Sequence, residues 1–255
     1  MGIYAGFDTF SYPGDAVMQS LWDHTNLYWC GFYLGPRYNF APKYVTLASM
    51  GWGVAPIYME KRRYRVLGGM SRAQQFAMGQ QDGREAVAWA RQASIQPPTT
   101  LYFDVEAGDR NNAWLEYFAG WSRAVADAYY GAGCYCSYLL ASWVVSSLMN
   151  RPGFDTVIPT IWAFNIDQAN PNGSVKKDSH GNQIPWAWLS PDYPVPPPSD
   201  SGYSAAIAWQ RAHGFGLQWE DASVGGKPVK KRLFPADLNT AFVRDPGNPA
   251  LRFLD

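Results

Sequence analysis

Over the first 160 residues, short apolar runs alternate with longer stretches in which apolar side chains recur every three or four positions. The short runs are typical of buried β-strands, and the longer stretches are typical of helices that pack one face against a sheet. This alternation predicts a series of βα units around a parallel sheet. Strands are predicted at residues 3–8, 28–34, 54–59, 101–106 and 133–138, and helices at residues 14–26, 42–50, 71–95, 111–131 and 141–150.

The stretch at residues 111–131 has the clearest helical pattern, with apolar side chains at three- and four-residue intervals from Trp114 to Ala128. Ser71 is suited to cap the start of the preceding helix. Gly131 is suited to end the helix at 111–131.

The helical rhythm stops after the apolar run at residues 161–164. Residues 165–204 contain seven prolines and no helical periodicity, which predicts a long loop of the kind that is often functional. Two more strands are predicted at residues 206–211 and 233–239, with a hairpin turn at Gly225-Gly226 before the second. Five βα units followed by three strands with little helix predict an α/β, TIM-like modified (β/α) barrel. Residues 1–255 are therefore interpreted as one barrel domain with a proline-rich insertion at 165–204.

Composition narrows the functional classes. The chain has 21 Lys and Arg against 21 Asp and Glu, so its formal net charge is zero. A nucleic-acid partner is not expected, because binding phosphates requires surplus basic residues. No apolar run reaches the roughly 18 residues of a membrane-spanning helix. The first residues lack the pattern of a secretory signal peptide.

Cysteine and histidine usage predicts neither a disulfide scaffold nor a metal site. Only three cysteines are present, and Cys134 and Cys136 would point to one face of the same strand. They are interpreted as buried apolar thiols. The three histidines are scattered, without ligand spacing. No metal and no cofactor are predicted.

Acidic residues mark the ends of three predicted strands. Asp104 and Glu106 end the fourth strand and share one face of it, because side chains alternate with a period of two. Asp8 ends the first strand, and Asp237 lies near the end of the last. The first and last strands of a closed eight-stranded barrel are neighbours, and catalytic residues of such barrels lie at the strand ends. We therefore expect these four carboxylates to converge on one mouth of the barrel.

A group of carboxylates fits general acid catalysis of glycoside cleavage, since burial and crowding keep one carboxyl protonated while the others stay ionised. The aromatic residues fit as well, because sugars stack their C–H faces on flat rings. Candidate platforms near strand ends are Trp52, Tyr58, Trp162 and Trp209.

Structural alternatives remain for each of these residues. Asp8 is alternatively a cap for the helix near Asp15, and Asp237 an N-cap for residues 238–243. The tryptophans are alternatively core residues. Clustered carboxylates also bind Mg²⁺ or Ca²⁺, but the ligand-loop signature is absent.

Four motifs in order resemble the lysozymes of glycoside hydrolase family 25: Gly6-Phe7-Asp8, Asp104-Val105-Glu106, Trp209-Gln210 and Asp237-Leu238-Asn239. The chain looks still more like the bacterial glycoside hydrolase-like domains long labelled as of unknown function. That resemblance rests on Gly6-Phe7-Asp8, Gly31-Phe32-Tyr33-Leu34, the run from Gly53 to Tyr58, the run from Tyr102 to Glu106, and Gly131-Ala132-Gly133. The resemblance implies a barrel of five βα units and three further strands. One departure is the 165–204 segment, which is longer and richer in proline than a compact family 25 enzyme has. Chitinases also end a strand in Asp-x-Glu, but their motif has another Asp where this chain has Tyr102, which counts against them.

The resemblance implies that Glu106 is the general acid and that Asp104 orients a substrate acetamido group or stabilises charge. Asp8 and Asp237 would complete the acidic cleft. The implied substrate is the β-1,4 bond between N-acetylmuramic acid and N-acetylglucosamine in peptidoglycan. The substrate-binding residues expected beside these acids are Tyr33, Tyr58, Trp162, Trp209 and Gln210.

The alternative function is a non-catalytic barrel that binds peptidoglycan or a related N-acetylhexosamine polymer, with the same acids lining a binding cleft. An enzyme without a signal peptide would be made in the cytoplasm and reach the cell wall or periplasm by a non-classical route. A lysin or a secreted antibacterial effector fits that route, and the expected partners are then a secretion system, a holin or an immunity protein.

Overall fold

The structure is a computed structural model. It describes residues 2–25, 27–59, 67–105, 110–154, 157–166, 196–217, 221–224, 227–229 and 234–248.

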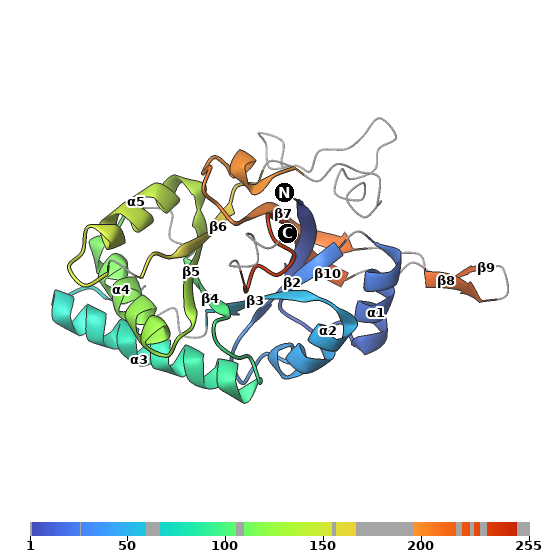
Figure 1. Cartoon of the computed structure of the whole chain (residues 1–255), viewed down its shortest axis with the longest axis horizontal. Helices are drawn as coiled ribbons and strands as arrows, with labels where there is room; N and C mark the ends of the chain where they lie inside the picture. Colours follow the sequence, from blue (N-terminus) through green and yellow to red (C-terminus); the bar gives the residue numbers. More distant parts are fainter. Residues whose placement is uncertain are drawn as a thin grey trace.

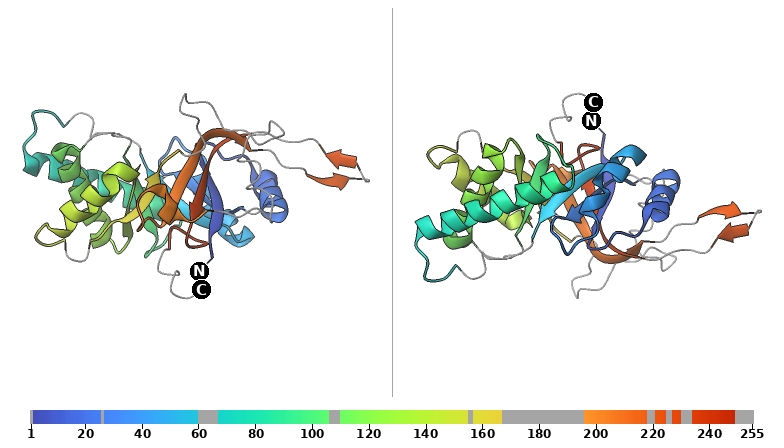
Figure 2. Two further views of the ribbon diagram at one scale, coloured as in Figure 1. Left: turned by 90° about the horizontal axis from the view of Figure 1, so that it is seen from above. Right: turned by 90° about the horizontal axis from the view of Figure 1, so that it is seen from below.

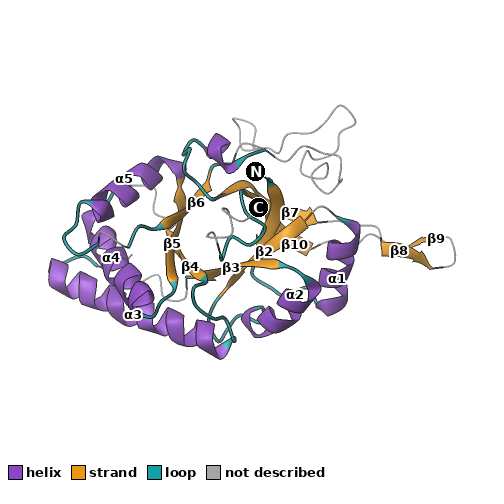
Figure 3. Cartoon of the chain, viewed as in Figure 1, coloured by secondary structure: helices purple, strands orange, loops and turns teal. Residues whose placement is uncertain are grey.

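In the described part of the chain, eight strands form a closed barrel and five α-helices lie outside it (Figures 1 and 3). The order around the barrel is β1-β10-β7-β6-β5-β4-β3-β2, so the first and last barrel strands are neighbours. This architecture confirms the TIM-like barrel of five βα units and three further strands. The barrel strands are β1 (Tyr4–Thr9), β2 (Leu27–Tyr33), β3 (Gly53–Tyr58), β4 (Thr100–Val105), β5 (Gly131–Ser137), β6 (Thr160–Phe164), β7 (Ala208–Leu217) and β10 (Phe234–Ala241). The helices are α1 (Asp15–His24), α2 (Tyr44–Met50), α3 (Arg72–Gln92), α4 (Asn112–Asp127) and α5 (Tyr138–Met149), with short 3₁₀ turns at Ala41–Lys43 and Pro198–Ser201.

Helix starts and stops follow local capping chemistry. Ser71 caps α3 as predicted, in a reciprocal capping box with Gln74. The prediction that Gly131 ends the helix at 111–131 is wrong, because α4 ends at Asp127 and Gly131 begins β5. Asp8 does not cap α1, whose N-cap is Gly14.

Side chains alternate between the barrel interior and the layer beneath the helices, as the strand period of two requires. The interior holds large aromatic residues, Trp29, Tyr102 and Trp162 among them. The larger apolar cluster lies between the barrel and its helices. Figure 2 shows this helical layer beside the barrel from two opposite directions.

Helices α3 and α4 approach each other closely, because three glycines line their contact: Gly79, Gly83 and Gly120. A Cβ atom on Gly79 would lie 1.8 Å from the Tyr117 carbonyl oxygen, and one on Gly120 would lie 2.0 Å from the Phe76 oxygen. These positions therefore require glycine.

One end of the barrel is closed by residues that follow β10. The Val54 N–H donates to the Asp245 carboxylate at 2.9 Å, and the Tyr102 hydroxyl donates to the Pro246 carbonyl at 2.7 Å. Both contacts lie toward the amino ends of the parallel strands. The opposite end, where the parallel strands finish, therefore carries the candidate site.

The last barrel strand runs against its neighbours, which the sequence pattern did not predict. β10 is antiparallel to both β1 and β7. Asp237 therefore does not lie at a carboxyl strand end, as expected, but in the first half of β10. The reversed direction still brings it level with Asp8, because the two residues are register partners.

A separate two-stranded sheet, β8 (Asp221–Val224) and β9 (Lys227–Val229), projects away from the barrel (Figures 1 and 2). Its strands pair antiparallel around the predicted hairpin position. Gly225 and Gly226 themselves lie outside the described residues, as does most of the predicted insertion at 165–204.

Candidate functional site

Three carboxylates from three strands meet at the open end of the barrel. Asp8 comes from β1, Asp104 from β4 and Asp237 from β10. Asp8 and Asp104 are buried. Burial raises the pKa of Asp8 well above its ordinary value, and the charges of Asp237 and Asp104 raise it further. The predicted convergence of these three acids is therefore present in the fold.

Asp8 lies where its protonated form is favoured. It has one hydrogen bond to a neighbouring side chain, in which the Asn239 amide donates to Asp8 Oδ2 at 2.8 Å. This bond lowers the pKa of Asp8, but burial and the neighbouring acids outweigh it. Asp8 is thus a neutral acid well above the pH at which an exposed carboxyl ionises.

Asp237 has a contrasting environment, with two hydrogen-bond donors and an imidazole close to its carboxylate. The Gly214 N–H donates to Oδ1 at 2.6 Å, and the Gln210 side-chain amide donates to Oδ2. The His213 Nδ1 lies 3.1 Å from Oδ1 and 3.2 Å from Oδ2. The two carboxyls therefore lie in unlike environments: Asp8 is buried and its pKa is raised, whereas Asp237 is surrounded by hydrogen-bond partners.

A bulge in β7 supplies two of these contacts. Leu238 of β10 is the register partner of Ala212, whereas Ala236 is the register partner of Phe215, so two residues of β7 face the single residue Asp237. These two residues are His213 and Gly214, and Gly214 has a φ of +69°. Bulges of this kind redirect a side chain at barrel rims and beside active sites.

The floor of the site is aromatic. The Trp162 indole donates to Asn239 Oδ1 at 3.2 Å, and so supports the amide that holds Asp8. Trp29 and Tyr135 pack edge-on against Trp162. A Cβ atom on Gly31 would lie 2.7 Å from Trp162 and 2.8 Å from Asp8 Cβ, so glycine lets floor and acid approach each other.

Tyr135 connects the floor to the acids. Its hydroxyl donates to Gln210 Oε1, and the other end of that amide donates to Asp237. Burial raises the pKa of Tyr135, and the charges of Asp8 and Asp104 raise it further. The phenol therefore remains protonated and acts as a hydrogen-bond donor.

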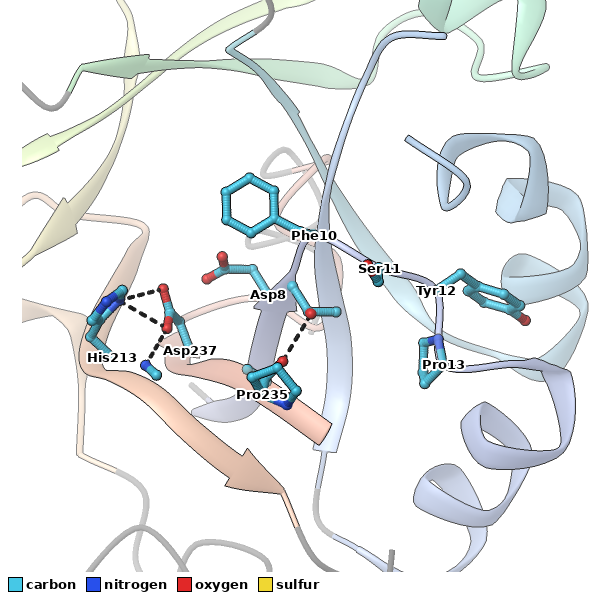
Figure 4. Close-up of a pocket in the computed structure, with 11 residues that line it drawn as sticks. Asp8, Phe10, Ser11, Tyr12, Pro13, His213, Pro235 and Asp237 are labelled. Atoms are coloured by element: carbon cyan, nitrogen blue, oxygen red, sulfur yellow. Dashed lines mark hydrogen bonds and ion pairs between the residues drawn. The ribbon is translucent and has the colours of Figure 1, made fainter. Parts of the chain in front are cut away.

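A pocket of about 260 Å³ opens beside Asp8 and Asp237. Figure 4 shows the Asp8 carboxylate directed toward Asp237, with His213 beyond Asp237 and the Phe10 ring above Asp8 in this view. Phe10 is 54% exposed and stacks on Tyr33 at a centroid distance of 4.5 Å. The pocket is lined by residues 8–13, 213–214 and 235–237.

The predicted substrate-binding residues separate into two groups. Gln210 contacts Asp237, Tyr33 supports Phe10 beside the pocket, and Trp162 is buried in the floor. Tyr58 and Trp209 are not among the residues that line the pocket.

Tyr58 is buried beneath the helices, against Trp89 and Trp121. The Trp209 indole donates to the Asn165 carbonyl, and Arg211 covers its ring. The candidate platform Trp52 packs on Phe7 and Trp22 in the outer layer.

Glu106 directly follows β4 and lies outside the described residues. Its role as general acid stays a prediction.

Four residues of the site were not predicted as functional: Phe10, Tyr135, His213 and Asn239. The sequence could have indicated Asn239, because it lies two positions after Asp237 and therefore shares a strand face with it. Tyr135 had the same signal, since it lies between the outward-facing Cys134 and Cys136. The sequence could not have indicated His213, because the bulge in β7 interrupts the alternation from which the direction of its side chain would be predicted.

The remaining sequence predictions concern thiols, metals and membranes. Cys134 and Cys136 are buried free thiols, as predicted. Within the described ranges, no group of three or more His, Cys, Asp or Glu side chains is arranged to hold a metal ion. No helix in the described part of the chain has the length and hydropathy needed to cross a membrane.

The barrel and its acids define a glycoside hydrolase-like domain of the TIM type. A family model described as "Rv2525c-like, glycoside hydrolase-like domain" matches residues 22–186, which is more than half of the chain, and the protein belongs to that family. The match includes Asp104 and Glu106, whereas Asp8 and Asp237 lie outside it. A comparison with curated proteins gives no match.

Solved structures share the fold at low sequence identity. An uncharacterized protein of B. stearothermophilus is 20% identical with a TM-score of 0.58, over 93% of this chain and 95% of that one. GHIP of Streptococcus pneumoniae, a virulence factor and glycosyl hydrolase 25, is 12% identical with a TM-score of 0.51, over 98% of this chain and 91% of that one. The Tat-secreted protein Rv2525c of Mycobacterium tuberculosis, in complex with L-tartrate, is 12% identical with a TM-score of 0.50, over 93% of this chain and 94% of that one. These likenesses concern the fold.

Proposed function

We propose that this protein is a glycosidase that cleaves bacterial cell-wall peptidoglycan at the β-1,4 bond between N-acetylmuramic acid and N-acetylglucosamine. The observation that carries the proposal is the unequal pair of acids, with a buried Asp8 whose pKa is raised beside an Asp237 that accepts hydrogen bonds from Gln210 and Gly214 and contacts His213. Glycoside hydrolysis needs one group that donates a proton and others that stabilise positive charge on the sugar.

The family resemblance supplies the division of roles. Glu106 protonates the leaving glycosidic oxygen, and Asp104 orients the acetamido group or stabilises charge at the reacting carbon. Asp237 contributes negative charge that favours the oxocarbenium-like transition state. Water completes the reaction by adding its hydroxyl to the reacting carbon and returning a proton to the acid. The fold of GHIP, named as a glycosyl hydrolase 25, supports this assignment at the level of architecture.

The test is the release of reducing ends from purified peptidoglycan, with mass spectrometry of the products to identify the cleaved bond. We expect activity in the wild type and loss of at least about a hundredfold in Glu106→Gln and in Asp104→Asn. Asp127→Asn is the matched control, because Asp127 is an exposed acid on α4, paired with Arg123. A wild-type protein that binds peptidoglycan but releases no reducing ends would contradict the enzymatic function and favour the glycan-binding alternative.

A further inference from the structure

The side-chain amide of Asn239 has a fixed orientation beside Asp8. Its oxygen Oδ1 accepts a hydrogen bond from the Trp162 indole at 3.2 Å. Its nitrogen Nδ2 donates to Asp8 Oδ2 at 2.8 Å and to the Asp237 backbone carbonyl at 3.1 Å. An indole N–H only donates and a backbone carbonyl only accepts, so both contacts require the same orientation of the amide. Asn239 therefore presents a donor, and not an acceptor, to Asp8.

This orientation determines which oxygen of Asp8 carries the proton of the neutral carboxyl. A hydrogen bond donated to Oδ2 is accepted best by an oxygen that has no proton, so the proton is on Oδ1. If the amide turned over, Asn239 Oδ1 would face Asp8 and accept a hydrogen bond from it, which would favour the neutral carboxyl further. The orientation of Asn239 therefore affects both the position of the proton and the balance between the neutral and charged forms of Asp8.

Trp162, which fixes that amide, is itself held edge-on by three aromatic rings. The ring centroids of Trp29, Tyr135 and Tyr102 lie 5.3, 5.2 and 5.5 Å from that of Trp162, with interplanar angles of 77°, 76° and 89°. The Trp162 side chain is fully buried. Because a close-packed interior leaves a large ring little freedom to turn, the indole N–H stays directed toward Asn239.

Tyr102 connects Trp162 to the closed end of the barrel. Its ring lies against Trp162, and its hydroxyl donates to the Pro246 carbonyl at 2.7 Å. The next residue, Gly247, fixes this carbonyl in place, because its N–H donates to the Val54 carbonyl at 2.6 Å and its own carbonyl accepts from the Thr100 N–H at 2.5 Å. The segment that follows β10 thus anchors the hydroxyl end of Tyr102.

We propose that Trp162 and Tyr102 are positioning residues for the acid site, which act through Asn239 to keep a hydrogen-bond donor on Asp8 Oδ2. Trp162 supplies the N–H that orients the amide, and Tyr102 ties the indole to the segment that closes the other end of the barrel. Neither residue lines the pocket beside the acids. The inference deepens the proposed function, and it rests on that function for the part that Asp8 has in the reaction.

The direction of the expected effect follows from the groups that face Asp8. Burial is the largest cause of the raised pKa of Asp8, and the charges of Asp237 on β10 and Asp104 on β4 add to it. Tyr135 on β5 also faces Asp8, whose charge contributes, after burial, to the raised pKa of that phenol. The hydrogen bond from Asn239 acts in the opposite direction and lowers the pKa of Asp8. Loss of this donor therefore raises the pKa of Asp8 further.

The experiment titrates Asp8 itself in the full chain. The NMR shift of its carboxyl carbon, assigned by comparison with Asp8→Asn, follows its protonation between about pH 3 and pH 10 without any substrate. Trp162→Phe keeps a buried ring but removes the indole N–H, so we expect the proton affinity of Asp8 to rise about tenfold. Tyr102→Phe keeps the indole but releases it from the closing segment, so we expect a smaller rise, of about twofold.

Trp121→Phe and Tyr130→Phe are the matched controls. Trp121 is a fully buried tryptophan of α4 in the outer apolar layer. The Tyr130 hydroxyl donates a buried hydrogen bond to the Ile95 carbonyl at 2.8 Å. The two control variants remove the same atoms as the two test variants, but away from the acids. The titration of Asp8 should therefore stay unchanged in both, although the stability of the fold falls.

The results of the titration can overturn the inference directly. An Asp8 titration that is unchanged or moved to lower pH in Trp162→Phe, or moved equally in Trp121→Phe, would do so. If Trp162→Phe does not fold, the comparison of Tyr102→Phe with Tyr130→Phe decides in the same way.

The titration also separates this inference from the proposed function. If the wild type releases no reducing ends but the proton affinity of Asp8 rises in Trp162→Phe, the positioning role stands and the enzymatic function falls. If the wild type cleaves peptidoglycan and the titration of Asp8 does not move, the function stands and the positioning role falls. Where both hold, the limb of the kcat/KM pH profile that reports Asp8 moves to higher pH in Trp162→Phe.

Discussion

Asp8 and Asp237 are register partners across the antiparallel pair β1–β10, and the protein surrounds the two carboxyls differently. Asp8 is buried above an aromatic floor and accepts from Asn239. Asp237 accepts from Gln210 and Gly214 and pairs with His213. Like charges directly opposite each other in a sheet are destabilising. The raised pKa of the buried Asp8 reduces this repulsion, because it favours the protonated form of one of the two partners.

The first prediction concerns the stability of Asp8→Asn. Because the pKa of Asp8 is raised in the folded protein, the folded state retains a proton that the unfolded chain releases above a pH of about 3.9. Folding stability therefore falls as pH rises from that value to the folded-state pKa, and remains lower above it. Asparagine does not titrate, so Asp8→Asn avoids this loss of unfolding free energy. We expect the substitution to raise Tm at pH 7 by about 2–4 °C for each kcal/mol of unfolding free energy that it restores, and to leave Tm unchanged at pH 3.

Thermal unfolding followed by circular dichroism at pH 3, 5 and 7 measures this difference. The exposed-acid variant Asp127→Asn should show no gain at pH 7, because Asp127 lies at the surface. A lower Tm for Asp8→Asn than for the wild type at pH 7 would show that the Asp8 proton is not retained. Loss of peptidoglycan cleavage together with the gain in stability would show that Asp8 is needed for function although it lowers folding stability.

The second prediction concerns the bulge residue Gly214. Its φ of +69° suits glycine, and its N–H donates to Asp237. Alanine at this position should destabilise the fold by about 1–2 kcal/mol, because its Cβ disfavours the left-handed conformation. Within the described part of the chain, no atom lies within 4 Å of the added Cβ, so the effect is assigned to backbone conformation.

Asparagine tolerates the left-handed region better than alanine. Urea denaturation should therefore rank the stabilities as wild type, then Gly214→Asn, then Gly214→Ala. Equal stabilities of the two variants would contradict the assigned backbone conformation.

Much of the fold could be predicted from the sequence because its strands are short apolar runs separated by amphipathic helices. The first and last strands were also correctly expected to be neighbours, since an eight-stranded barrel must close. The period of two placed Asp104 on the interior face of β4, where the fold has it. These features depend on local patterns and on closure, both of which can be derived without coordinates.

The direction of β10 and the bulge in β7 could not be predicted in the same way. The hairpin turn predicted at Gly225-Gly226 indicates a local antiparallel pair. It does not specify how the barrel strands before and after it pair with each other and with β1. The bulge shifts the alternation between Gln210 and Leu217, so His213 shares a site with Gln210 although they are three residues apart. Burial of Tyr58 beneath α3 and α4 likewise depends on helix packing, which the apolar character of the strand does not specify.

The third prediction concerns Gly31, which lies beside Asp8 on the neighbouring strand β2. An added Cβ would approach both Trp162 and Asp8 Cβ to less than 3 Å, so the floor or the acid must move. We expect Gly31→Ala to cost about 1–3 kcal/mol in unfolding free energy, measured by urea denaturation. Gly68→Ala is the control, because no atom of the described residues lies within 4 Å of its added Cβ. Equal effects of the two substitutions would contradict the close approach of Gly31 to the floor.

The last prediction concerns the Tyr135 hydroxyl, which orients Gln210 toward Asp237. Tyr135→Phe keeps the ring that packs on Trp162 but leaves Gln210 Oε1 without this donor, at a cost of about 1–3 kcal/mol in unfolding free energy. Because Gln210 is then free to reorient and withdraw its donor from Asp237, we expect kcat on peptidoglycan to fall by about tenfold, with a smaller change in KM.

Tyr130→Phe is the matched control for this loss. The Tyr130 hydroxyl also makes a buried hydrogen bond, to the Ile95 carbonyl at 2.8 Å, but it lies in the outer apolar layer rather than at the acids. Its removal should therefore cost a similar amount of stability while leaving kcat unchanged. Steady-state kinetics of the two variants, measured alongside their urea denaturation curves, separate the roles. A similar fall in kcat for both would mean that activity follows stability alone, and that Tyr135 does not position Gln210 for the reaction.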